Sequence, residues 1–218
     1  MEPILRNTST IDWITIIIFL SLLFVVVAKS VFYTRFINFI ILPFNNKYIF
    51  MYNKKEKIVN WFNLFFGIFI VLNFSLFIYL SRSILFQPTQ NNPSIIFPLI
   101  MGSILLFMIL KVLLQLGNSF IFGAQKTISE IIFKKISYFN YSGLIIFLAN
   151  IILTYIIIDS IVVVYVALLL ILLVNVIGWI TVLRNHQKFI ANNFFYFILY
   201  LCALEIAPFI LIGSYLKD

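Results

Sequence analysis

A single carboxylate, Glu205, lies near the middle of the last long apolar run of the chain, residues 194–216. A charged side chain at the centre of a membrane-spanning helix costs between roughly 2.5 and ~10 kcal/mol, so it is usually paired, protonated or facing water. Pro208 follows three residues later and removes the hydrogen bond that the carbonyl of Leu204 would otherwise accept. The sequence therefore predicts an intramembrane polar site in this turn.

Lys111 is the natural partner for Glu205, because it interrupts another apolar run, residues 95–117. At 1.5 Å per residue, Lys111 lies about 9 Å and Glu205 about 16 Å from the same membrane boundary. A lysine side chain can cover most of this difference. We therefore expect a buried Glu205–Lys111 pair. Two alternatives stay open: Glu205 as a functional site that binds and releases a proton, or Glu205 as the contact for a basic residue of a partner protein.

Asn150 and Asn175 also interrupt apolar runs. Amide side chains that bond across membrane helices contribute ~0.6 kcal/mol on average. We interpret both residues first as packing contacts and second as the lining of a substrate path. Small residues allow helices to approach closely, and four glycines are expected to do so: Gly67, Gly102, Gly143 and Gly178.

The chain lacks the recognisable motifs of catalytic and metal-binding proteins. Cys202 is its only cysteine and His186 its only histidine, which excludes an internal disulfide and sites built from several Cys or His ligands. The sequence contains no His-Glu-x-x-His pattern, no glycine-rich phosphate loop and no paired carboxylates spaced to hold a metal and a diphosphate. We therefore predict a non-enzymatic protein with no cofactor.

The composition is that of a membrane protein: 63% of the 218 residues are hydrophobic, 10% are charged, and the mean hydropathy is +1.12. Since a spanning helix needs ~20 mostly apolar residues, the chain predicts about six transmembrane helices in a single domain, residues 1–218. The apolar runs are continuous rather than alternating, which favours an all-α polytopic bundle over a β-barrel. The expected spans are residues 13–28, 61–80, 95–117, 139–158, 160–183 and 194–216.

Basic residues gather in the connections after the first, third and fifth expected spans. Such residues mark the side of a membrane to which the chain is not translocated. They predict a bacterial inner-membrane protein with cytoplasmic odd-numbered loops and periplasmic N- and C-termini. Lys54, Lys55 and Lys57 are candidates for contact with anionic lipid headgroups. Because membrane topology accounts for the positive net charge, we do not expect nucleic acid as a partner. We expect the lipid bilayer and other membrane subunits instead. The basic residues are Lys29, Arg35, Lys47, Lys54, Lys55, Lys57, Lys126, Lys134, Lys135, Arg184 and Lys188.

Two of these loops contain amphipathic segments. Residues 30–42 remain apolar around Arg35 and Asn38, so they predict either an interfacial helix with Arg35 facing water or a bent extension of the first span. Residues 125–138 place Ile128, Ile131 and Ile132 at helical spacing. We expect interfacial amphipathic helices that lie flat on the cytoplasmic leaflet.

The layout resembles a family of Bacteroidota inner-membrane proteins of unknown function, numbered four-two-seven-one in the unknown-function series. The likeness rests on residues 139–143 (Phe-Asn-Tyr-Ser-Gly) and on residues 201–208 (Leu-Cys-Ala-Leu-Glu-Ile-Ala-Pro). It implies the inner membrane of that phylum and supplies no activity, so no catalytic residue carries over.

Two functions follow as hypotheses. The first is a non-enzymatic subunit or assembly factor of a cell-envelope complex, with secretion or gliding machinery as a host by lineage alone. The alternative is a small proton-coupled transporter in which Glu205 carries the proton. The lack of a detectable internal repeat favours the first.

Overall fold

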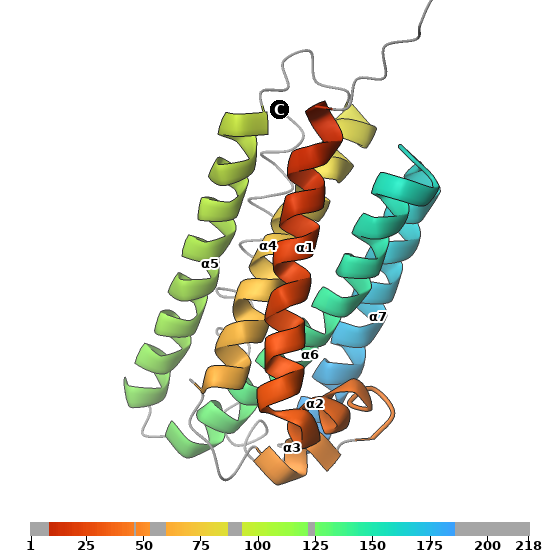
Figure 1. Cartoon of the computed structure of the whole chain (residues 1–218). Helices are drawn as coiled ribbons and strands as arrows, with labels where there is room; N and C mark the ends of the chain where they lie inside the picture. The colour runs from red at the N-terminus through yellow and green to blue at the C-terminus, as the bar shows by residue number, and fades with distance from the viewer. Residues whose placement is uncertain (1–8, 46, 53–59, 87–92, 122–124, 186–218) are drawn as a thin grey trace, which may run out of the picture.

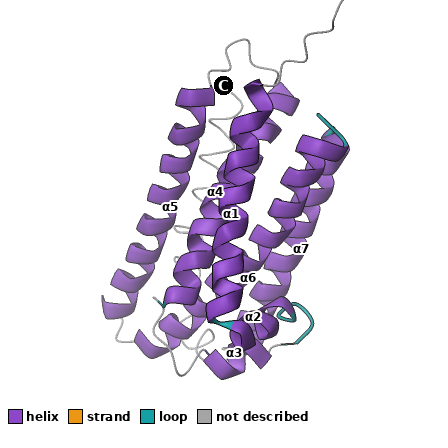
Figure 2. Ribbon diagram, viewed as in Figure 1, coloured by secondary structure: helices purple, strands orange, loops and turns teal. Residues whose placement is uncertain are grey.

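The computed structural model of the protein describes residues 9–45, 47–52, 60–86, 93–121 and 125–185. This part of the chain is helical and contains no strand (Figure 2). The helices are α1 (Ser9–Val31), α2 (Tyr33–Ile40), α3 (Lys47–Tyr52), α4 (Trp61–Phe86), α5 (Pro93–Ile121), α6 (Gln125–Ile151) and α7 (Ile161–Asn185), with a π-helical turn, η1 (Ile152–Ile156), directly after α6.

Five of these helices, α1, α4, α5, α6 and α7, are long and apolar enough to cross a membrane. They overlap the first five expected spans, although the fourth begins at Ser129 rather than at residue 139, and they confirm an all-α membrane bundle. The sixth expected span, residues 194–216, lies outside the described residues. Large apolar side chains cover the outer surfaces of the helices, as in Phe19, Leu106 and Val162, where a bilayer would solvate them.

Helices α4 and α6 form the centre of the bundle (Figure 1). Helix α4 packs against α1, α5 and α6, and α6 packs against α7 as well. At one end the core is aromatic and includes Phe62, Phe66 and Phe69 of α4. Toward the other end it becomes largely aliphatic, with Ile146, Leu153 and Val164. Rings fill volume with few rotatable bonds, so the aromatic end is well suited to fixed packing.

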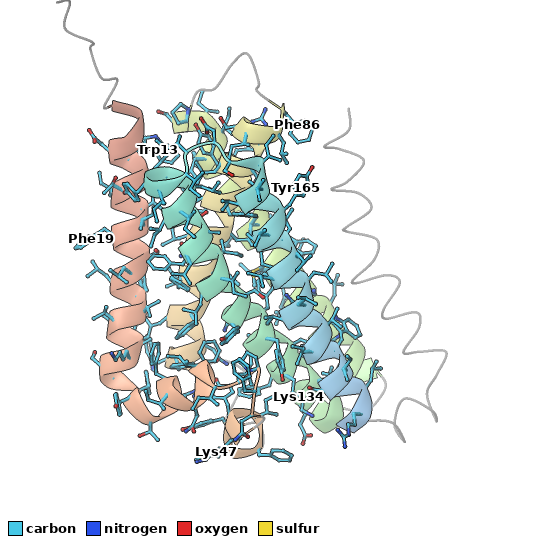
Figure 3. All side chains as sticks on the ribbon, turned by 90° about the vertical axis from the view of Figure 1, so that its right-hand side faces the viewer. Trp13, Phe19, Lys47, Phe86, Lys134 and Tyr165 are labelled. Atoms are coloured by element: carbon cyan, nitrogen blue, oxygen red, sulfur yellow. The ribbon has the colours of Figure 1, made fainter. Side chains whose placement is uncertain are left out.

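The two ends of the bundle also differ in charge. The last turn of α1 carries Lys29 and the last turn of α7 carries Arg184. In Figure 3, Lys47 and Lys134 lie at one end, whereas Trp13, Phe86 and Tyr165 lie toward the other. We call the first of these the basic end. Basic residues from four separate helices therefore lie at the same end of the bundle.

Residues 30–42 form a separate short helix. The chain turns at Phe32, whose φ of −124° and ψ of 50° are not helical, and α2 then leaves the direction of α1. The interfacial-helix alternative placed Arg35 in water, and that placement is wrong: only 5% of its surface is exposed. Its guanidinium lies among aromatic rings and polar atoms of α3 and α4, which replace part of its hydration.

Residues 125–138 do not form a separate surface helix. They are the first half of α6, which continues without a break to Ile151. Ile131, Ile132 and Phe133 are buried in the bundle, and so is Lys134, with 4% of its surface exposed. Amphipathic spacing indicates that one face of a helix is buried, but it does not indicate whether lipid or protein buries it. Here the neighbouring helices bury that face.

Close helix contact occurs at two of the four expected glycines. A Cβ atom at Gly178 would lie 2.7 Å from Cγ of Tyr138, and one at Gly143 would lie 3.3 Å from Cβ of Ile70. At Gly67 and Gly102 a Cβ atom would meet nothing within 4 Å. Of these four, only Gly143 and Gly178 are needed for packing.

We expect Gly178→Ala to destabilise the bundle by ~1–3 kcal/mol, the usual cost of forcing an extra methyl group into a filled core. Tyr138 cannot easily move aside, because it is 1% exposed and its hydroxyl lies 3.5 Å from Oγ1 of Thr181. The matched control is Gly67→Ala, which should be neutral or stabilising by up to ~1 kcal/mol through helix propensity. Thermal unfolding in detergent measures both changes. Equal midpoints for the two variants would contradict the tight Gly178–Tyr138 contact.

Candidate functional site

Several of the expected site residues lie outside the described residues: Glu205, Pro208, Lys54, Lys55 and Lys57. The Glu205–Lys111 pair and the lipid-headgroup contacts therefore stay predictions. Lys111, Asn150 and Asn175 are described, on α5, α6 and α7.

Lys111 belongs to the side of α5 that faces the bundle. It is half-buried and continues a stripe of half-buried residues that recurs every three or four positions through Phe97, Ile104 and Phe107. The Phe97 ring lies 5.4 Å from the ring of Trp13 on α1, which fixes the direction of this stripe. No residue in the spanning part of α5 is fully buried. Lys111 is thus directed toward a partly covered seam rather than toward open lipid.

The two asparagines join helices. Nδ2 of Asn150 donates to the backbone carbonyl of Asn73 on α4 at 3.0 Å and lies 3.5 Å from the Asn73 Oδ1. Nδ2 of Asn175 donates to Oγ of Ser142 on α6 at 2.9 Å and to its own helix at Ile171 O at 2.8 Å. No described hydrogen bond connects either amide to Lys111. The structure therefore places the two asparagines in separate helix contacts and joins neither of them to Lys111.

The basic end holds a cluster that we did not predict from the sequence. Arg35 lies over three rings, with its Cζ atom 4.7 Å from the centroid of Phe62, 4.8 Å from Tyr52 and 5.7 Å from Tyr48. Its Nε and Nη2 atoms are both 3.3 Å from the Tyr48 hydroxyl, and Nη2 is 3.5 Å from Oδ1 of Asn63. Cations over desolvated rings are bound by ~2 kcal/mol or more. Arg35 therefore fastens α2 to α3 and α4.

Further ring contacts extend this attachment. Tyr48 stacks on Phe133 of α6 at 5.9 Å with an interplanar angle of 13°. Phe39 of α2 contacts Phe66 at 4.6 Å and Tyr141 at 5.9 Å. We call residues 33–45 and 47–52 the elbow. Aromatic pairs contribute ~0.5–1.5 kcal/mol each beyond burial, so the elbow is held against α4 and α6 as a fixed unit.

The outer surface of the elbow also carries aromatic side chains. The exposed fraction is 62% for Tyr33, 89% for Phe44 and 71% for Phe50, and it is 67% for Trp61 at the adjoining start of α4. Buried rings thus hold the elbow in place while other rings project from it. These four exposed residues form the elbow surface.

A family model described as domain of unknown function DUF4271 matches residues 14–216 of the chain. The chain belongs to the DUF4271 family. This confirms the resemblance and extends it from the first span to the last expected one. No curated protein and no solved structure matches the chain.

The described candidate residues of this DUF4271 member make packing contacts between helices. Among the described residues, no group of three or more His, Cys, Asp or Glu side chains could hold a metal ion. A sequence signal for the elbow did exist: Arg35 is followed by Tyr48, Tyr52 and Phe62, and the two tyrosines stand one helical turn apart. The spacing alone does not predict the contact, because the contact depends on the turn at Phe32 that brings Arg35 toward α3 and α4.

Proposed function

We propose that this DUF4271 member is a non-enzymatic subunit or assembly factor of a bacterial cell-envelope complex. The observation that carries the proposal is the elbow: two non-spanning helices pinned by Arg35, with Tyr33, Phe44 and Phe50 exposed. Tyr, Trp and Phe are enriched in protein interfaces relative to the rest of the surface. A preorganised surface also loses less conformational freedom on binding.

The polar groups in the middle of the bundle support this function over proton transport. Asn73, Asn150 and Ser75 are buried there, and their amide and hydroxyl groups neither gain nor lose a proton near neutral pH. A carrier would depend on Glu205, which lies outside the described residues. The contacts of the amides with neighbouring helices supply stability instead.

The basic end faces the cytoplasm of a bacterial inner membrane in this proposal, because Lys and Arg are retained on that side. Both termini are then periplasmic. A reporter that is active only in the periplasm should work when fused after Asp218 and fail when inserted at Asn53. The reverse pattern would contradict the assigned orientation.

The docking role is tested by purification in mild detergent. The wild-type chain should recover other membrane subunits at a stable stoichiometry. The double variant Phe44→Ser/Phe50→Ser should lose them, because it removes the two most exposed rings of the elbow surface. The matched control is Phe86→Ser, at an exposed phenylalanine toward the opposite end of the bundle. Recovery of every variant, and of the wild type, only as a free monomer would overturn the proposal.

A further inference from the structure

A lysine lies over a tryptophan ring where α6 meets α7, at the basic end of the bundle. The Nζ atom of Lys135 is 4.0 Å from the ring centroid of Trp179, and both side chains are half-buried. The contact lies beside the close approach of the two helices, because Gly178 packs against Tyr138, one helical turn after Lys135. The tight packing of α6 against α7 therefore fixes the positions of the ammonium and the ring. We call these two residues the α6–α7 edge.

The α6–α7 edge carries positive charge. The contact with the Trp179 ring is electrostatic and leaves the Lys135 ammonium charged, so it still attracts an anion. Arg184 adds a second, exposed cation in the last turn of α7, about 7.5 Å along the axis from Trp179. Helix α7 contains no acidic residue, and Glu130, the acidic residue of α6, interacts electrostatically with Lys134. An anion is therefore the ligand that the charges of this edge fit.

An apolar surface of α7 begins directly beside these charges. Leu169, Leu172 and Val176 are exposed, and at 100° per residue they lie within about 80° of Trp179 around the helix. From Leu169 to Trp179 this surface runs about 15 Å along the axis, which is half of the ~30 Å hydrocarbon core. Tryptophan is typical of the headgroup level, and a lysine stem directs its ammonium toward that level. The edge thus offers a cation at headgroup depth and an apolar face one leaflet long.

We propose that the α6–α7 edge binds an anionic phospholipid. Its phosphate contacts Lys135 and Arg184, and one acyl chain lies along the exposed face of α7. Basic sites between transmembrane helices bind anionic headgroups, and each basic residue near the surface contributes to that attraction. A zwitterionic headgroup fits less well, because its own cation offsets the attraction of its phosphate. The site depends neither on the subunit role nor on the orientation proposed above.

The fluorescence of Trp179 tests this site in the full-length protein. The reporter variant Trp13→Phe/Trp61→Phe leaves Trp179 as the only tryptophan of the chain. It is placed in vesicles that mix phosphatidylglycerol and phosphatidylcholine, with bromine atoms on the acyl chains of one lipid or the other. Bromine quenches an indole that it touches. At equal mole fraction, brominated phosphatidylglycerol should occupy the site severalfold more than brominated phosphatidylcholine. Equal quenching by the two lipids would overturn the proposal.

Two substitutions in the reporter locate the preference. Lys135→Gln should lower it by up to about fivefold, which corresponds to the ~1 kcal/mol of one basic residue near a lipid surface. Arg184→Gln should lower it similarly while it leaves the tryptophan contact in place. The matched control is Lys47→Gln, because Lys47 is exposed and its neighbour Tyr48 stacks on Phe133, about 200° around α6 from Lys135. An unchanged preference in both the Lys135 and Arg184 variants would contradict the site.

Other occupants give different results. Inorganic phosphate in the buffer should not change the quenching; loss of the preference in phosphate would mean that a free anion occupies the site, and would overturn the lipid proposal. Shielding of Trp179 from both lipids as the ratio of protein to lipid rises would assign the site to a second copy of the chain. A last measurement needs no variant: the wild-type chain in detergent, observed by native mass spectrometry, should retain phosphatidylglycerol at lower lipid concentration than phosphatidylcholine. Equal retention would contradict the proposal.

Discussion

Glu205→Ala should lower the amount of folded protein in the membrane far more than Glu205→Gln. If Lys111 is paired with Glu205, removing the carboxylate leaves the half-buried Lys111 ammonium without compensation, at a cost of up to the roughly 3–5 kcal/mol of a broken buried pair. Glutamine keeps the shape and a hydrogen-bond acceptor at the same position. The direction of Lys111 is consistent with such a pair, because its stripe on α5 faces the bundle. Membrane levels and thermal midpoints of the two variants measure the difference.

The double variant Glu205→Ala/Lys111→Met separates the pair from a functional acid. Both charges then leave the membrane together, and protein levels should largely recover. Normal accumulation with lost function would give Glu205 a role beyond packing. A harmless Lys111→Met change, with a double variant no better than Glu205→Ala, would show that the pair does not exist.

Arg35→Ala is the second change with a large expected effect. It removes a cation that lies over three rings, together with its hydrogen bonds to the Tyr48 hydroxyl and to Oδ1 of Asn63. A single desolvated cation–π contact is worth ~2 kcal/mol. The elbow should loosen from α4, with a drop of several degrees in the thermal midpoint. Arg35→Lys should recover part of the loss at most, because an ammonium cannot reproduce the planar stacking of guanidinium.

Lys47→Ala is the matched control for Arg35, since Lys47 is an exposed cation of the same elbow. Its loss should be nearly neutral, as expected for an exposed surface charge. Faster proteolysis within the elbow of Arg35→Ala, with α4 intact, would locate the loosening. Identical midpoints for the two variants would show that the Arg35 contacts contribute nothing.

The sequence predicted the five described spans because hydrocarbon imposes a simple length rule on helices. It also predicted that Asn150 and Asn175 would interrupt those spans, and the structure shows which groups they meet on α4 and α6. Such features depend on the type of residue and its depth in the membrane. Both can be read along the chain without knowing how helices are arranged.

The remaining features depend on contacts between distant segments. Arg35 has the same neighbours in sequence whether it faces water or the rings of Tyr52 and Phe62. Likewise, Gly178 differs from Gly102 only because Tyr138 of another helix lies against it. The amphipathic period of residues 125–138 fits a lipid surface and a bundle core equally well. These outcomes follow from the arrangement of helices, which periodicity does not specify.

Native mass spectrometry of the wild-type chain, released directly from membrane vesicles, tests the proposed subunit role most directly. The account predicts that the chain leaves the membrane together with other protein subunits in a fixed ratio, and that Phe44→Ser/Phe50→Ser releases it alone. Release of the wild-type chain with only lipid bound, at every expression level, would contradict the account.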